Sequence, residues 1–137
     1  MDKFVWPVRV YYEDTDSGGV VYYANYLKFM ERARTEWLRT RGFEQDALLQ
    51  EQRLMFAVRS LTVDYRRPAR FNDLLAVVSE MVETRGASLL FEQTIRRDAS
   101  AEALCSARVR VACIDAESFR TRRIPRRLME EIGGNIK

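Results

Sequence analysis

One feature limits the possible folds of this sequence most strongly. A single long segment has apolar residues at helical spacing, and a series of extended segments follows it. From about residue 22 to 41, apolar side chains recur at helical spacing, and polar side chains such as Lys28 and Arg39 fill the other face. The apolar positions are Tyr26, Phe29, Met30, Ala33, Trp37 and Leu38. We expect Asn25 to cap this helix and Gly42 to end it. A helix of about five turns with a broad apolar face is expected to lie across a sheet.

The segments after Arg53 are predominantly extended. Apolar and β-branched residues predict strands over 54–65, 74–83, 88–96 and 103–114. Turn-forming residues, such as Pro68, Asn72-Asp73 and Arg85-Gly86, separate these strands. Such short connections favour antiparallel neighbours. Shorter helical segments are expected over 43–52 and 126–132.

An earlier strand and a polar loop precede the long helix. Val8, Val10 and Tyr12 alternate with other side chains, which predicts a half-buried first strand. The residues DTDSGG at 14–19 then predict a loop, because they are turn formers. The order strand, long helix, then four strands predicts one α+β domain over residues 1–137, with an antiparallel sheet wrapped around the helix.

The composition excludes several classes of protein. With 47% apolar and 11% aromatic residues, the chain of 137 residues matches a packed globular protein. No apolar run exceeds five residues, so no membrane-spanning helix is expected. The start of the chain also lacks the apolar stretch of a secretory signal, and a soluble cytoplasmic location is therefore expected.

The absence of histidine limits the chemistry available to the chain. Histidine-based nucleophile systems and nearly all zinc sites built on imidazole are ruled out. The two cysteines, Cys105 and Cys113, would lie on one face of a strand, too far apart to form a disulfide, and are interpreted as small buried apolar residues. Catalysis would therefore depend on carboxylate, hydroxyl or backbone groups.

Asp14 and Asp16 are the first candidates for such chemistry, because their loop leads into the start of the long helix. A helix start offers free backbone N–H groups that can hold an oxyanion, and a nearby carboxylate can act as base or nucleophile. The spacing alone favours turn hydrogen bonds for both aspartates. A calcium loop is a weak alternative, since Gly18 stands where an oxygen ligand is required and Asn25 where a bidentate Glu is required. An aspartyl phosphatase would need a parallel sheet and a longer chain.

A long motif resembles a known enzyme family. The string VRVYYEDTDSGGVVYYANY at 8–26, continuing into ERARTE at 31–36, is similar to the YbgC branch of the hotdog-fold acyl-CoA thioesterases, which is related to 4-hydroxybenzoyl-CoA thioesterase. The likeness extends through 63–65, 68–69, Asp73 and the final strands, so it covers almost the entire chain.

The resemblance implies a hotdog fold, a long central helix wrapped by a sheet of five to six antiparallel strands. It implies hydrolysis of an acyl-CoA thioester, with Asp16 as the catalytic carboxylate and the backbone N–H of Tyr23 as the group that polarises the thioester carbonyl. Gly19 would let the substrate approach the loop. By their positions in the sequence, Tyr12, Tyr22, Tyr26 and Trp37 could line the acyl pocket, although aromatic residues at such spacings are more often core, as we expect for Trp37. Many YbgC members carry His where this chain has Tyr23. A homotetramer is implied, and no metal or redox cofactor.

Two other classes of function stay open at this point. One is a non-catalytic scaffold that binds acyl carrier protein or envelope lipid. An arginine cluster at 120–127 could contact coenzyme A phosphates, acyl carrier protein or lipid headgroups, so peripheral membrane contact is possible. The other is a nucleic-acid binder, which only the net charge of +3 and the arginines suggest; no nucleic-acid partner is expected.

Overall fold

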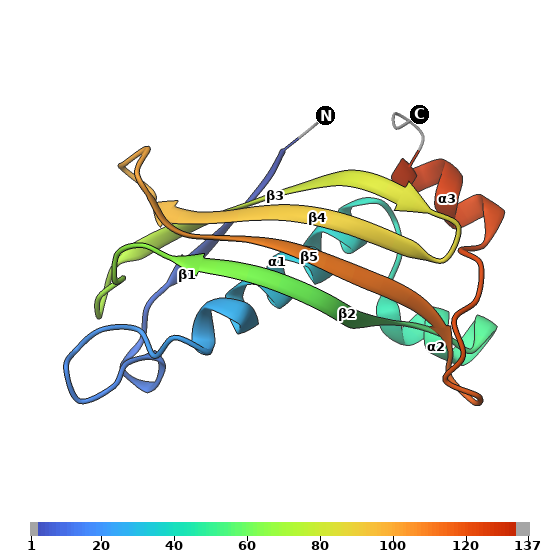
Figure 1. The fold of residues 1–137 in the computed structure, drawn as a ribbon, viewed down its shortest axis with the longest axis horizontal. Helices are drawn as coiled ribbons and strands as arrows, with labels where there is room; N and C mark the ends of the chain where they lie inside the picture. The colour runs from blue at the N-terminus through green and yellow to red at the C-terminus, as the bar shows by residue number, and fades with distance from the viewer. Residues whose placement is uncertain (1–2, 134–137) are drawn as a thin grey trace.

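A curved antiparallel sheet covers one side of a long helix in the computed structural model, which describes residues 3–133 (Figure 1). The strands lie in the order β1-β3-β4-β5-β2. Their bounds are Phe4–Arg9 for β1, Leu54–Tyr65 for β2, Leu74–Arg85 for β3, Ser88–Arg97 for β4 and Ala103–Asp115 for β5. The helices are α1 over Asn25–Thr40, α2 over Gln45–Gln52 and α3 over Arg126–Gly133, and a short 3-10 turn, η1, spans Tyr12–Asp14. This architecture confirms the predicted α+β hotdog fold, with five strands.

Helix α1 ends at a glycine, as the sequence predicts. Gly42 has a φ of 92°, a left-handed conformation that favours glycine. Its N–H donates to the Arg39 carbonyl, and the Phe43 N–H reaches back to the Leu38 carbonyl. These two bonds satisfy carbonyls that the last helical turn would otherwise leave free. The chain can therefore turn away sharply toward α2.

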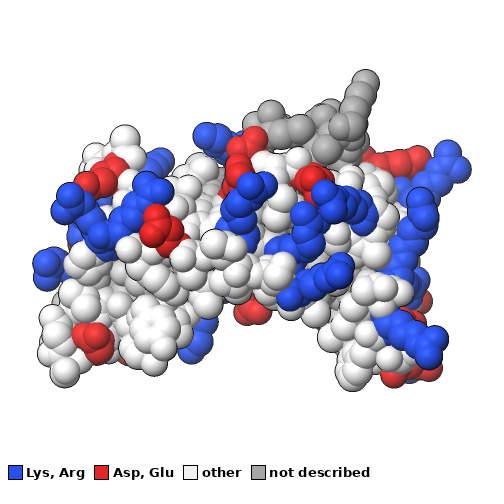
Figure 2. Space-filling view, viewed as in Figure 1, with Lys and Arg blue, Asp and Glu red and all other residues white. Residues whose placement is uncertain are grey.

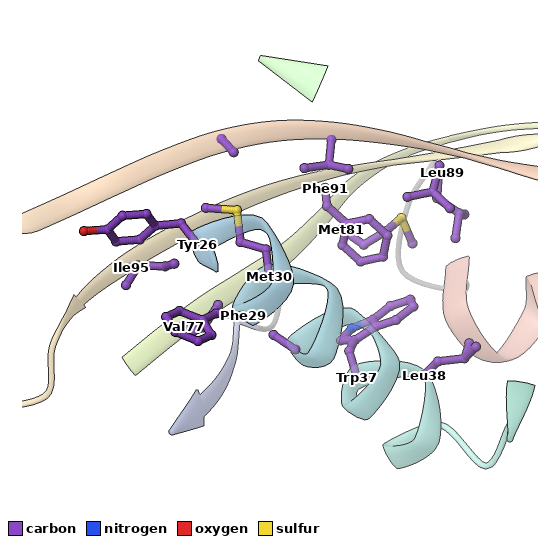
Figure 3. Packing of buried hydrophobic residues seen from close by; sticks show 14 of the residues in the cluster. Tyr26, Phe29, Met30, Trp37, Leu38, Val77, Met81, Leu89, Phe91 and Ile95 are labelled. Atoms are coloured by element: carbon purple, nitrogen blue, oxygen red, sulfur yellow. The ribbon is translucent and has the colours of Figure 1, made fainter. Parts of the chain in front are cut away.

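The core lies between the apolar face of α1 and the concave side of the sheet. All six predicted apolar positions of α1 are buried. Figure 3 shows Trp37 of α1 close to Phe91 of the sheet, and their ring centroids are 5.1 Å apart in an edge-to-face arrangement. Large side chains packed in this way contribute most of the stabilisation of a domain of this size. Cys105 and Cys113 are buried in β5 as free thiols, which confirms their interpretation as small core residues.

The first strand differs from its prediction. It begins at Phe4 and ends at Arg9, because its partner β3 begins at Leu74, opposite Arg9. Val10 is buried, but the chain then enters η1 and leaves Tyr12 78% exposed. The alternation was therefore misleading at Tyr12, which stacks on Phe71 with ring centroids 4.3 Å apart.

The start of α1 also differs from its prediction. The helix begins at Asn25, three residues later than expected, and Asn25 makes no side-chain cap. The backbone at Ala24 is already helical, and the Asn25 N–H donates to the Tyr22 carbonyl, so a tight turn leads directly into the helix. The Asn25 side chain instead donates to the Asp14 carbonyl at 2.9 Å.

Strand β2 forms one edge of the sheet and pairs only with β5. It runs from Leu54, beside α2, to Tyr65, whose ring contacts Tyr23 at the opposite end of the molecule. Apolar side chains are exposed along it, with Val58 at 44% and Leu61 at 40%. An exposed apolar edge strand is available to pair with another strand.

Candidate active site

The loop between β1 and α1 is held in place by Asp14. The Asp14 carboxylate accepts a hydrogen bond from the Tyr11 N–H at 2.8 Å. Its backbone carbonyl accepts two more, from the Tyr22 N–H and from the Asn25 side chain, each at 2.9 Å. Asp14 therefore joins η1 to the start of α1. The turn-forming interpretation of this aspartate is confirmed.

Asp16 is exposed at the outer part of the same loop. One carboxylate oxygen, Oδ1, accepts a hydrogen bond from the Gly18 N–H at 2.8 Å. Its backbone N–H donates to the Val20 carbonyl, and its carbonyl accepts from the Gly19 N–H. The side chain is thus oriented by a turn of its own, which confirms the turn bond predicted for it. Within residues 3–133, the second oxygen makes no hydrogen bond.

Gly19 is required by the backbone of this loop. Its φ is 78°, and a side chain built there would meet nothing within 4 Å, so the surface above it is open. The Gly19 carbonyl accepts from the Phe71 N–H, which ties the loop to the segment before β3. Gly19 therefore combines a conformation that favours glycine with an unobstructed approach to the loop.

Tyr23 lies one residue before the N-cap of α1. The N–H groups of Tyr22 and Asn25 are both used in hydrogen bonds. Across the described part of the chain, those of Tyr23 and Ala24 make none. A free N–H at a helix start carries partial positive charge and can bind a developing oxyanion. Tyr23 as a residue is 60% exposed.

The two other tyrosines of the predicted site lie in different surroundings. Tyr22 is exposed, its ring centroid is 4.8 Å from that of Tyr23, and the neighbouring Tyr23 hydroxyl raises its pKa. Tyr26 is buried, and its hydroxyl accepts a hydrogen bond from the Ala69 N–H at 2.9 Å. Burial raises the pKa of Tyr26. Asp16, Tyr22 and Tyr23 are thus exposed, whereas Tyr26 is buried.

Sequence reasoning missed two features, one beside this loop and one farther along α1. Tyr65, at the end of β2, joins the aromatic group, with its ring centroid 5.5 Å from that of Tyr26 and 6.1 Å from that of Tyr23. A cavity of about 500 Å³ also lies between α1, β2 and β4, and Arg34 lines it. Arg34 follows the buried Ala33 on the helix. A polar side chain at the border of the apolar face was therefore the sequence feature that could have indicated this cavity.

A curved five-stranded sheet around one helix, with a carboxylate loop leading into that helix, defines a protein of the hotdog thioesterase type. The chain belongs to the thioesterase-like superfamily, whose family model matches residues 10–132. Within residues 3–133, no helix has the length and apolar character needed to cross a membrane.

Relatives with assigned activities are similar over most of the chain. The acyl-CoA thioesterase YbgC of Haemophilus influenzae is 55% identical over 112 residues, which cover 82% of this chain and 81% of that protein. The acyl-CoA thioester hydrolase YbgC of Escherichia coli is 49% identical over 128 residues, with coverage of 93% and 94%. These values confirm the resemblance to the YbgC branch that the motif at 8–26 indicates.

Solved structures agree with this assignment. A probable thioesterase from Bartonella henselae aligns with a TM-score of 0.85 and 36% identity, covering 90% of this chain and 100% of that one. A 1,4-dihydroxy-2-naphthoyl-CoA thioesterase from Synechocystis has a TM-score of 0.88 at 22% identity, covering 96% of each chain. The second similarity supports the fold alone.

Proposed function

We propose that this chain hydrolyses acyl-CoA thioesters to a free acid and coenzyme A. The similarity to YbgC proteins named for this activity, at 49–55% identity over most of the chain, is the observation that carries the proposal. The loop between β1 and α1 supports it, because it combines a carboxylate with a free oxygen and a free backbone N–H. Both groups can act without histidine.

Asp16 supplies the carboxylate in this proposal. As a general base, it removes a proton from water, whose oxygen attacks the thioester carbonyl carbon; as a nucleophile, it attacks that carbon itself and water then cleaves the resulting anhydride. In either route the C–S bond breaks, and the departing sulfur takes up a proton to give the coenzyme A thiol. The free Oδ2 is the atom available for either role.

The backbone N–H of Tyr23 binds the oxyanion that forms on the carbonyl oxygen. Its position at the start of α1 adds the partial positive charge of the helix end. The open surface above Gly19 leaves room for the thioester to approach, and the exposed ring of Tyr22 lies beside that of Tyr23. Tyr26, which is buried, holds Ala69 in place, and the Ala69 carbonyl in turn accepts a hydrogen bond from the Val21 N–H at the end of the loop.

We also propose that two copies complete each site and that two such dimers form a homotetramer. The apolar edge of β2 favours pairing with a second copy of itself. In an antiparallel pair, the Tyr65 end of one β2 lies beside the Leu54 end of the other. The carboxylate loop, residues 10–24 between β1 and α1, lies near Tyr65. Phe56, near the other end of β2, lines the cavity. The carboxylate loop of one subunit would then approach the cavity of the other subunit.

A second candidate function is a scaffold that binds acyl carrier protein or anionic lipid. Figure 2 shows basic side chains gathered at the end of the molecule that carries α2 and α3. There, Arg122 lies 3.7 Å from Asp115 and Arg126 lies 3.5 Å from Glu130. Among the described residues, Arg120, Arg123 and Arg127 have no carboxylate within 4 Å. These side chains can contact phosphate or carboxylate groups of a partner.

A thiol-release assay distinguishes the two candidates. The protein is incubated with acyl-CoA substrates of graded chain length, aliphatic and aromatic, and free coenzyme A is measured. Turnover of at least one substrate is expected. Retention of acyl carrier protein or anionic vesicles on the immobilised protein, without cleavage of any thioester, would instead support the scaffold. The cytoplasmic location expected from the sequence stays a prediction.

A further inference from the structure

Two adjoining cavities form a groove along α1, beside the edge strand β2. The larger, of about 500 Å³, reaches Trp37, and the smaller, of about 250 Å³, reaches back to Leu27. Three residues line both cavities and connect them: Glu31, Arg34 and Val58. Because a helix rises 1.5 Å per residue, the groove follows about 15 Å of α1, starting within the first turn after the carboxylate loop.

Where the two cavities meet, the groove contains an arginine without a carboxylate partner, Arg34. The Arg34 guanidinium is half-buried and donates to Oε1 of Gln93 at 2.9 Å. No carboxylate within residues 3–133 lies within 4 Å of it, although many arginines of this chain have such a partner. Burial lowers the pKa of Arg34, and the charge of the nearby Glu31 acts in the opposite direction. A partly desolvated guanidinium with free donors is costly unless a ligand or partner binds it.

The buried side-chain amide of Gln93 fixes the orientation of the Arg34 guanidinium. Gln93 is 1% exposed, and its Nε2 donates to the Met30 carbonyl at 3.0 Å and to the Ser79 hydroxyl at 2.8 Å. With both amide hydrogens engaged, the oxygen of Gln93 faces the guanidinium. The remaining N–H groups of Arg34 are therefore held in place beside the groove.

The groove carries a net positive charge. Trp37 contributes to its wall, but the indole nitrogen of Trp37 is buried and does not reach the groove surface. The charged residues that line the groove are Lys28, Glu31 and Arg34, so its net charge is +1. Arg34 lies about 10 Å along α1 from Leu27, so an apolar chain that starts near Leu27 and ends in an anionic, oxygen-bearing group can reach its free N–H groups.

We propose that Arg34 determines specificity by binding a carboxylate at the distal end of the acyl chain. The preferred substrates would then be thioesters of dicarboxylic acids, with the chain in the groove and the thioester at the carboxylate loop. This inference rests on the proposed thioesterase function and adds the class of acyl group. A guanidinium is suited to it because it can bind both carboxylate oxygens at once.

Matched substrate pairs test the proposal. The kcat/KM values of dodecanedioyl-CoA and dodecanoyl-CoA are compared. The shorter pair, adipoyl-CoA and hexanoyl-CoA, is compared as well, because a second subunit at the site would shorten the space available to the acyl chain. In at least one pair we expect the wild type to prefer the carboxylate-ended substrate. Arg34→Gln should lower kcat/KM for that substrate by about 10- to 100-fold, as expected for loss of a charge-assisted hydrogen-bond pair, and leave the methyl-ended substrate within about threefold.

Two further variants separate recognition from folding. Arg34→Lys keeps the charge without the planar fork and should restore part of the preference. Arg32→Gln alters an exposed arginine two residues earlier on α1, outside both cavities, and should leave the preference unchanged. Thermal unfolding of each variant verifies that the fold is retained.

Several outcomes would overturn the proposal. These are a wild-type preference for the methyl-ended member of both pairs, or an equal loss for both members in Arg34→Gln. A change in oligomer mass without a change in preference would show that Arg34 binds a carboxylate of a second copy. If the wild type cleaves none of the four thioesters, the proposed function itself fails. Calorimetric binding of dodecanedioate against dodecanoate, in wild type and Arg34→Gln, then decides the role of Arg34.

Discussion

At the scale of single residues, the two loop aspartates show what a sequence can and cannot separate. Their spacing predicts turn hydrogen bonds for both, and each carboxylate makes one. Only the family motif distinguished Asp16 as the expected catalytic carboxylate. The structure adds that Asp14 also binds the start of α1 through its carbonyl, whereas Asp16 is exposed with one free oxygen. Those contacts join residues from separate elements, so local pattern could not predict them.

Substitutions at Tyr23 test which of its atoms takes part in the reaction. Tyr23→Phe keeps the backbone N–H and should leave kcat/KM within about threefold, because the proposed mechanism gives the phenol hydroxyl no role in the reaction. Tyr23→Pro removes the donor and should cost on the order of 10²–10³ in rate. Steady-state kinetics with one good acyl-CoA measure both effects, provided that circular dichroism and light scattering show Tyr23→Pro folded and assembled. A collapse of activity in Tyr23→Phe would assign the phenol a direct role.

The two cysteines give a prediction about pH. Burial raises the pKa of Cys105 to about 12 and that of Cys113 to about 11. A raised thiol pKa leaves less thiolate at a given pH, so at pH 8 only about one thiol in a thousand or fewer is ionised. Labelling with a thiol-reactive disulfide at pH 8 should be slow in the native protein and fast in urea. Equal rates in both conditions would contradict the buried placement of these residues.

At the scale of elements, long hydrophobic patterns predicted the bounds of helices and strands better than short ones. The strand at 54–65 and the end of α1 agree with their predictions, because each is specified by residues within the segment itself. The first strand was placed too late, since its end depends on where β3 begins, which is 65 residues away in sequence at Leu74. Pairing over such separations is not encoded in a local alternation.

The end of α1 offers a test at this scale. Gly42→Ala places a Cβ on a backbone with a φ of 92°, and it should lower the free energy of unfolding by about 1 kcal/mol. Gly42→Asn is the matched control and should lose less, because Asn tolerates this conformation better. Urea unfolding measures both variants. If the two variants are equally stable, another feature ends the helix.

At the scale of the whole molecule, the sheet has two edges, and only the β2 edge lies beside the Arg34 cavity. The order of strands and the cavity arise from pairings between distant segments, so the sequence pattern predicted the fold class without predicting either. The family resemblance supplied the expected tetramer. The exposed apolar side chains of β2 give that expectation a physical basis.

Assembly through β2 can be tested by introducing an aspartate on each of the two edge strands of the sheet, one at a time. Leu61→Asp places a carboxylate on the exposed face of β2 and should reduce the oligomer to smaller species with loss of most activity. Val5→Asp makes the same kind of change on the other edge strand, β1, where Val5 is also exposed, and should leave the mass unchanged. Multi-angle light scattering measures the mass. A fully active wild-type monomer would contradict the proposed assembly.

The most direct test of the central claim compares the two loop aspartates in the same assay. Asp16→Asn and Asp14→Asn are the same nearly isosteric change made two residues apart, and in Asp14→Asn the new amide oxygen can still accept the Tyr11 N–H. Hydrolysis of one good acyl-CoA is followed by release of free thiol. The account predicts that Asp16→Asn lowers kcat by about 10²–10⁴ with KM little changed, while Asp14→Asn keeps most of the activity. An Asp16→Asn enzyme with nearly wild-type kcat would contradict it.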